Sequence, residues 1–137
     1  MMHADQLTQK GEGKVVAVID TGVEMTHPAF AGAMASTPSL TADKVASLTP
    51  KLGDGKLGVY VSEKFPFAYD YADGDNDAMP AKGSYGSHGT HVAGITAGNA
   101  DQIIGVAPEA QIIVAKVSRS EDGEIPDSAL LASLDDM

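Results

Sequence analysis

The chain has 137 residues, 43% of them hydrophobic, which is enough length and apolar content for one domain with a core. Its 19 acidic and 9 basic residues give a net charge of −10, which repels nucleic acid phosphates and anionic membranes and excludes both as partners. The absence of cysteine excludes disulfide bonds and a thiol nucleophile.

We expect a short helical lead-in over 2–9, and the first strong element, a strand, follows it. Residues 15–19 form a continuous β-branched and apolar run, typical of a parallel strand buried on both faces. Asp20 ends this run, before the turn formed by Thr21 and Gly22. Functional groups gather at the carboxyl ends of parallel strands, so Asp20 is the first candidate site residue.

The next segment, at about 31–66, is rich in Ser, Thr, Gly, Pro and Lys and lacks clear periodicity. We predict an irregular surface insertion with one short helix over 42–47. A second strand is expected over 67–71, because aromatic residues there alternate with small and acidic ones.

An acidic turn follows the second strand, with aspartates at 73, 75 and 77. The spacing imitates the start of a calcium loop. However, Ala78 stands where that loop needs glycine, and Ser84 where it needs a bidentate glutamate. We therefore interpret the segment as a solvated turn and assign no metal to it.

Small residues over 88–97 predict a helix ended by Gly98, with 99–104 as a short loop. A third buried strand is expected over 110–117. Pro126 then opens a last helix, whose apolar stripe we assign to the core: Leu130, Leu131 and Leu134. The order strand, strand, helix, strand, helix predicts an α/β layer fold.

His88, at the mouth of the glycine-flanked helix, is the second candidate site residue. A carboxylate such as that of Asp20 can fix the imidazole tautomer, so that the other ring nitrogen takes a proton from a serine hydroxyl. The helix N-terminus disfavours positive charge and helps a neutral base. We expect Gly89 to leave room beside the imidazole, and Gly94 to let the helix lie close to the sheet.

Three segments resemble the subtilisin-like serine proteases: VVAVIDTGVEMTHPAF, HGTHVAGITAGN and GVAPEAQIIVAKV. They occur in the family's order and cover most of the chain. The insertion and the FAYDY strand are most similar to the cell-envelope proteinases of Gram-positive bacteria. The resemblance implies a partial, truncated doubly wound parallel sheet, with 1–137 as the N-terminal portion of a catalytic domain.

The resemblance also implies the roles of the site residues. Asp20 would be the orienting carboxylate and His88 the general base, with Thr21 and Gly22 shaping the turn. The family's nucleophilic serine lies in a Gly-Thr-Ser-Met-Ala-type motif that this sequence lacks, so we expect it beyond residue 137. The parent would be a serine endopeptidase acting on protein or peptide substrates, and the fragment alone would be inactive.

Further expectations concern cofactors and location. No cofactor is expected. Many subtilisin-like proteases bind calcium through an aspartate in an His-Pro-Asp sequence, but Ala29 stands at that position here, so calcium is not assigned. The resemblance implies an extracellular or cell-wall location. A sheet cut partway exposes a strand edge, through which the chain would self-associate.

Two alternatives remain open. One is a non-catalytic binding or assembly module, a pseudo-peptidase on the same fold. The other is a metal-dependent hydrolase with Asp20, His88 and His91 as ligands, since the histidines are spaced for one helix face. Against the second, we interpret His91 as a packed, hydrogen-bonded helix residue. His27 is expected to pack in a loop.

Overall fold

The computed structural model describes residues 6–51, 57–82 and 87–137. Its elements are β1 (Val15–Asp20), η2 (Pro28–Phe30), α1 (Ala42–Leu48), η3 (Thr49–Lys51), β2 (Phe67–Asp70), α2 (Ser87–Ala97), β3 (Asn99–Ala100), β4 (Ile103–Ile104), β5 (Gln111–Lys116) and α3 (Asp127–Asp136). The three predicted strands and the three predicted helices after residue 10 are therefore confirmed. The helix expected over 2–9 lies partly outside the described residues, and 7–9 are not helical.

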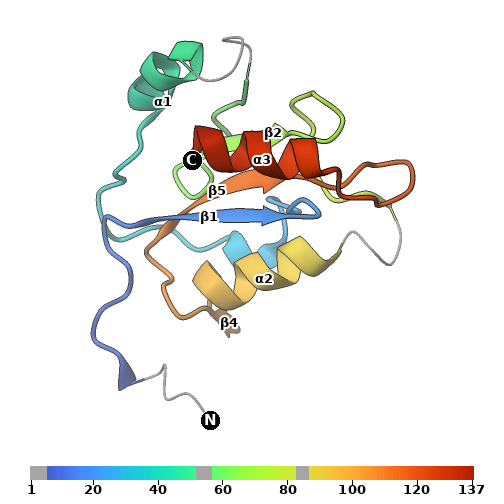
Figure 1. Ribbon diagram of the computed structural model, residues 1–137. Coiled ribbons are helices and arrows are strands. Elements are labelled where there is room, and N and C mark those ends of the chain that lie inside the picture. The colour runs from blue at the N-terminus through green and yellow to red at the C-terminus, as the bar shows by residue number, and fades with distance from the viewer. Residues whose placement is uncertain (1–5, 52–56, 83–86) are drawn as a thin grey trace.

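The three main strands form a parallel sheet in the order β1-β5-β2. In this register Asp20, Lys116 and Asp70 share the last row, at the carboxyl ends of the strands. Parallel neighbours need long crossover connections, and here the insertion, α2 and the β3–β4 hairpin lie within them. Figure 1 shows α2 on one face of the sheet and α3 on the other. The predicted α/β fold with a partial parallel sheet is confirmed.

Alternate residues of the strands supply two apolar clusters, one on each face, because successive side chains in a strand point to opposite sides. The α2 face holds the larger cluster, which includes Val18, Ala68, Ile112, Val114, Ala93 and Ala97. The opposite face holds a smaller cluster, built on Val45 of α1 with Phe67, Tyr69 and the partly buried Ile113. Helices therefore cover both faces.

The prediction that the first strand is buried on both faces is wrong. In β1 only Val18 is buried, while Ala17 is exposed. The physical reason is position, since β1 lies at one edge of the three-stranded sheet and β5 at its centre. Composition indicates a parallel strand but does not specify its place in the sheet.

The assignment of the last helix's leucine stripe to the core is also wrong. Leu130, Leu131 and Leu134 are 38%, 66% and 56% exposed, and the buried residues of α3 are Ala129 and Ser133. Small side chains bring this helix against the sheet, and the leucines point away from it. Within the described residues, nothing covers them.

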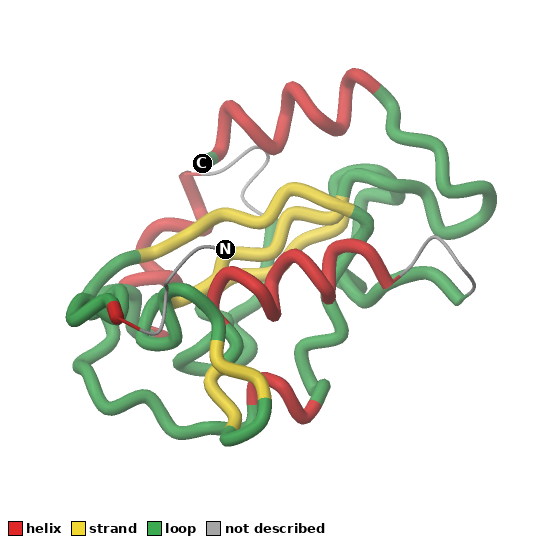
Figure 2. Tube along the Cα trace, turned by 90° about the horizontal axis from the view of Figure 1, so that it is seen from below, coloured by secondary structure: helices red, strands yellow, loops and turns green. Residues whose placement is uncertain are grey.

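The loop expected over 99–104 is instead a small antiparallel hairpin, β3–β4. Asn99 pairs with Ile104 and Ala100 with Ile103. The hairpin is fastened to the end of α2, because the Gly105 N–H donates to the Gly98 carbonyl at 2.8 Å. Figure 2 shows it beside the C-terminal end of that helix. Two-residue strands carry too little periodicity for sequence recognition.

Candidate active site

Asp20 lies at the carboxyl end of β1, where backbone pairing continues into the next segment. Its carbonyl accepts the Val117 N–H at 2.9 Å, which fixes its main chain beside the end of β5. Its carboxylate oxygen Oδ1 accepts the Thr21 N–H at 2.7 Å and the Thr21 hydroxyl at 3.1 Å. The side chain is only 16% exposed, so these bonds hold the carboxylate in one orientation.

His88, in the first turn of α2, meets that carboxylate. Its Nδ1 lies 2.9 Å from both Asp20 oxygens, and its side chain is 69% exposed. A carboxylate accepts hydrogen bonds, so Nδ1 carries the hydrogen and a neutral ring presents Nε2 as the acceptor. None of the hydrogen bonds found among the described residues uses Nε2. The geometry offers a proton acceptor at the surface.

Two glycines allow the turn after β1 and the start of α2 to approach closely. A Cβ on Gly89 would lie 2.2 Å from the Gly22 carbonyl oxygen and 3.1 Å from Asp20 Oδ1. Gly22 has φ +96, which suits glycine. Gly89 therefore makes room for backbone and carboxylate. The expectation for Gly94 is wrong, because a Cβ there would meet nothing within 4 Å.

The start of α2 is fastened to this turn by two reciprocal hydrogen bonds. The Gly89 N–H donates to the Thr21 hydroxyl at 3.2 Å, and the Glu24 N–H donates to the Thr90 hydroxyl at 2.9 Å. Each segment thus donates a backbone N–H to a threonine of the other. This double connection fastens the turn after β1 to the start of α2.

A cavity of about 980 Å³ opens on another side of α2. His91 and His27 line it, together with exposed apolar residues of α2 and the hairpin such as Ile95 and Ile104. Asp20 and His88 are not among its lining residues. This cavity is therefore separate from the imidazole–carboxylate contact.

The interpretation of His91 as a packed residue is wrong, because it is exposed and faces the cavity. On α2, Gly89 packs against the end of β1, whereas His91, about one turn after His88, faces the cavity instead. His27 packs in its loop as predicted, with Nδ1 accepting the Ala29 N–H at 3.1 Å and its ring against Phe30 at 6.4 Å.

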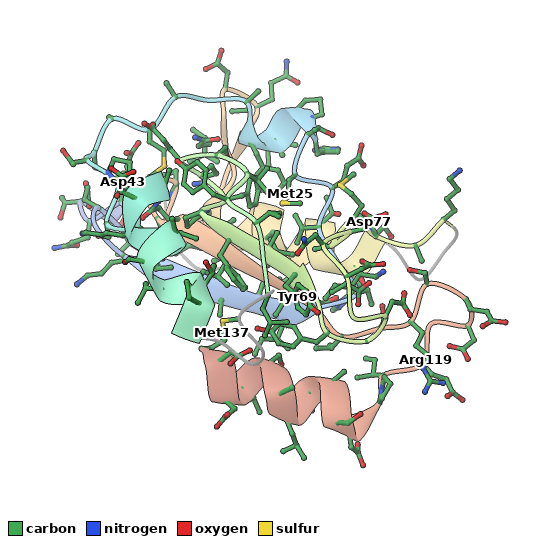
Figure 3. The ribbon with its side chains drawn as sticks, turned by 90° about the horizontal axis from the view of Figure 1, so that it is seen from above. Met25, Asp43, Tyr69, Asp77, Arg119 and Met137 are labelled. Carbon is green, nitrogen blue, oxygen red and sulfur yellow. The ribbon has the colours of Figure 1, made fainter. Side chains whose placement is uncertain are left out.

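Within the three described ranges, no group of three His, Asp or Glu side chains is arranged to hold a metal ion. The metal-hydrolase alternative has no geometric support there. The aspartates of the acidic turn bind backbone instead: Asp75 Oδ1 accepts the Asp77 N–H and Asp77 Oδ1 accepts the Met79 N–H. In Figure 3, Asp77 and Arg119 lie on loops beyond the carboxyl ends of the strands.

Sequence reasoning missed a buried ion pair at the same edge. The Lys116 ammonium lies 2.5 Å from Asp70 Oδ2, and both side chains are 1% exposed. Lys116 also bonds Ser120 at 2.6 Å and lies 3.6 Å from Asp73. Hydrogen bonds from Ser120 lower the pKa of Asp73. The available signal was that each strand ends in a charged residue.

Comparison with known proteins identifies the family of this chain. A model of the Subtilase family, Peptidase S8, matches residues 11–136. The PI-type proteinase of Lactococcus lactis subsp. cremoris is 36% identical over 135 residues, which is 93% of this chain and 7% of that protein. The Thermophilic serine proteinase of Bacillus sp. (strain AK1) is 32% identical over 131 residues, 93% of this chain and 24% of that protein.

A solved structure, described as a cold adapted subtilisin-like serine proteinase, aligns with a TM-score of 0.59 and 27% identity. The alignment covers 96% of this chain and 34% of that one, so the chain spans about a third of that protein and less of the curated relatives. The resemblance found in the sequence is confirmed, and the chain belongs to the subtilase family.

Proposed function

We propose that this chain supplies the aspartate and histidine of an Asp–His–Ser triad in a serine endopeptidase. The observation that carries the proposal is the contact of His88 Nδ1 with both oxygens of Asp20 at 2.9 Å, on a ring that is 69% exposed. Burial of the carboxylate and exposure of the ring are what a general base that must reach a substrate requires.

In this mechanism each group has a defined role. Asp20 holds the ring and stabilises the imidazolium as it forms. His88 Nε2 removes the proton from a serine hydroxyl as that oxygen attacks the peptide carbonyl, and then gives the proton to the departing amine. Water repeats the sequence on the acyl-enzyme. The serine would come from polypeptide beyond residue 137, with 1–137 as the N-terminal portion of the catalytic domain.

The substrate would be a protein or peptide, and the location extracellular or cell-wall associated. Support comes from the matched family and from relatives such as the PI-type proteinase and the C5a peptidase of Streptococcus pyogenes, 31% identical over 115 residues. None of the helices in the described ranges is long and apolar enough to cross a membrane. Self-association through an exposed sheet edge stays a prediction.

The test is a chimera in which this chain replaces the matching segment of the lactococcal PI-type proteinase. We expect cleavage of casein, reduced by a factor on the order of a million in His88→Ala. His91→Ala is the matched control, because it removes a histidine from the same helix without touching Asp20. It should change turnover less than tenfold.

Two outcomes would contradict the proposal. One is a chimera that folds, by its circular dichroism and thermal transition, but does not cleave casein. The other is equal activity with and without the His88 imidazole. The chain alone should show no peptide cleavage above its own His88→Ala variant, since an Asp–His pair has no acyl-enzyme route without a serine.

A further inference from the structure

The Thr21 hydroxyl occupies a position between the two candidate site residues. It donates to Asp20 Oδ1 at 3.1 Å and accepts the Gly89 N–H at 3.2 Å. A hydroxyl has one hydrogen to donate and two lone pairs to accept, so the two bonds are compatible. One side-chain atom therefore contacts both the carboxylate and the helix that carries the imidazole.

The Thr21 hydroxyl gives the Gly89 N–H a hydrogen-bond acceptor that α2 itself does not supply. The first four N–H groups of an α-helix lack intrahelical acceptors and normally take a capping side chain from the residue just before the helix. In α2, which begins at Ser87, the Gly89 N–H is one of these four. Its acceptor is the hydroxyl of Thr21, 68 residues earlier in the sequence. The residue that follows β1 therefore caps the N-terminus of α2.

The bond to Asp20 leaves the other carboxylate oxygen for the histidine. Oδ1 already accepts the Thr21 N–H at 2.7 Å and the hydroxyl, while Oδ2 accepts no hydrogen bond from Thr21. His88 Nδ1 approaches both oxygens at 2.9 Å. Both Thr21 donors bond Oδ1. They oppose rotation of the carboxylate about its Cβ–Cγ bond by holding this one oxygen.

We propose that Thr21 is a positioning residue, whose hydroxyl sets the orientation of the Asp20 carboxylate and the distance of His88 from it. This inference rests on the proposed function, in which that pair is the base system, and adds to it a third side chain. The Thr21 hydroxyl bonds Asp20 and the Gly89 N–H, so its action on His88 runs through the carboxylate and the start of α2.

The structure provides a matched control for this inference. Thr90 makes the other hydrogen bond between the same two segments, by accepting the Glu24 N–H at 2.9 Å. Thr90→Val therefore weakens the connection between turn and helix without removing any donor to Asp20. If Thr21 acted only by fastening the two segments, both valine variants would have the same effect on the imidazole–carboxylate contact.

The experiment is proton and nitrogen NMR on the 137-residue chain, which does not depend on activity. An imidazole N–H bonded to a carboxylate gives a strongly downfield proton signal. We expect this signal from His88 Nδ1–H in the unmodified chain, in Thr21→Ser and in Thr90→Val. In Thr21→Val it should move upfield and exchange with water faster. Amide exchange of Gly89 should accelerate about tenfold in the same variant, as expected for one lost hydrogen bond.

In the chimera, Thr21→Val should lower kcat by a factor on the order of ten, with KM unchanged, and Thr21→Ser should restore it. An unchanged downfield signal in a folded Thr21→Val chain would overturn the role of Thr21 alone. An equal shift in Thr90→Val would do the same. Absence of the signal from the unmodified chain would overturn the pair, and the proposed function with it.

Discussion

The two ends of the central strand β5 hold polar side chains in contrasting ways. At the amino end, the buried Gln111 side chain exchanges three hydrogen bonds of 2.7 to 2.9 Å with the backbone at Leu40 and Glu63. The Lys64 ammonium donates to two carbonyls of the turn before β5, at 2.8 Å each. These groups fasten the insertion to the sheet.

At the carboxyl end, the hydrogen bonds of the polar groups are not all satisfied within the fold. Asp20 is held by its neighbours, but His88 is 69% exposed, and within the described ranges it forms hydrogen bonds through Nδ1 alone. Buried polar groups that are fully hydrogen-bonded stabilise a structure, whereas a held group with an exposed, unused acceptor is available for reaction. Changes at the amino end should therefore affect stability, and changes in the pair should affect activity.

The largest expected effect is on turnover. Asp20→Asn removes the charge that stabilises the imidazolium and favours the wrong tautomer, so kcat of the chimera should fall on the order of ten-thousandfold. The unfolding midpoint in urea should move little. Asp77→Asn, on the loop at the same edge, is the control and should leave kcat within a few-fold. A loss of stability large enough to unfold Asp20→Asn would contradict the separation of the two ends.

The ion pair between Lys116 and Asp70 is an exception to the contrast between the two ends of β5. It lies at the carboxyl end but is fully buried, so it should affect stability. Asp70→Asn leaves the buried Lys116 ammonium with the more distant, 30% exposed Asp73 carboxylate as its counter-charge, and should cost about 3 kcal/mol of unfolding free energy. Replacing both residues by Leu and Met should cost less than the single change. Denaturant unfolding measures both. A single variant as stable as the parent would sink this account of the edge.

Two glycines of α2 should respond in opposite directions. Gly89→Ala drives a methyl against the Gly22 carbonyl, at 2.2 Å before relaxation, and should cost about 3 kcal/mol. Gly94→Ala meets nothing within 4 Å and should stabilise the helix by up to about 1 kcal/mol. Thermal unfolding of the two variants decides the point. Equal effects would mean that the close approach at Gly89 is absent in solution.

At the amino end, Gln111→Ala removes three hydrogen bonds and deprives backbone groups at Leu40 and Glu63 of their side-chain partner. The expected loss is about 2–3 kcal/mol of unfolding free energy. The kcat of the folded chimera should stay within a few-fold of the parent. A stable variant with impaired turnover would reverse the assignment of the two ends.

The smallest effect concerns pH. Burial lowers the pKa of Lys64 to about 8 in the folded chain, against an ordinary value of 10.5, and Glu109 partly opposes this. Between these values the unfolded chain binds more protons, so the unfolding free energy should rise with pH. The gain should be about 1 kcal/mol from pH 7 to 9, relative to Lys64→Met at the same pH. Parallel pH profiles of the two proteins would contradict it.

Sequence reasoning reached the elements that strong local patterns specify. The apolar runs before Asp20 and around Val114 predicted strands, and the small residues after His88 predicted a helix. The pairing of Asp20 with His88 was suggested by their places at a strand end and a helix start and made specific by the family resemblance, and their side chains are in contact in the structure. Segments that match a known family indicate which distant residues lie together in the fold, whereas hydrophobic periodicity indicates local structure only.

What the sequence did not predict depends on neighbours rather than on local pattern. An apolar stripe such as Leu130, Leu131 and Leu134 requires a covering surface, and its burial depends on which elements are present. The exposed edge of β1 has the same cause. The Lys116–Asp70 pair joins residues 46 positions apart, and the hydrogen bond from the Gly89 N–H to the Thr21 hydroxyl joins residues 68 positions apart. They follow from the sheet register, which no single segment encodes.

The central claim is that His88 donates through Nδ1 to Asp20 and presents Nε2 as the proton acceptor. Nitrogen-15 spectroscopy of the imidazole in the 137-residue chain, at a pH where the ring is neutral, tests it most directly. We predict that the hydrogen resides on Nδ1 in the parent and that this preference is lost in Asp20→Asn. A ring that carries its hydrogen on Nε2 in both proteins would contradict the account.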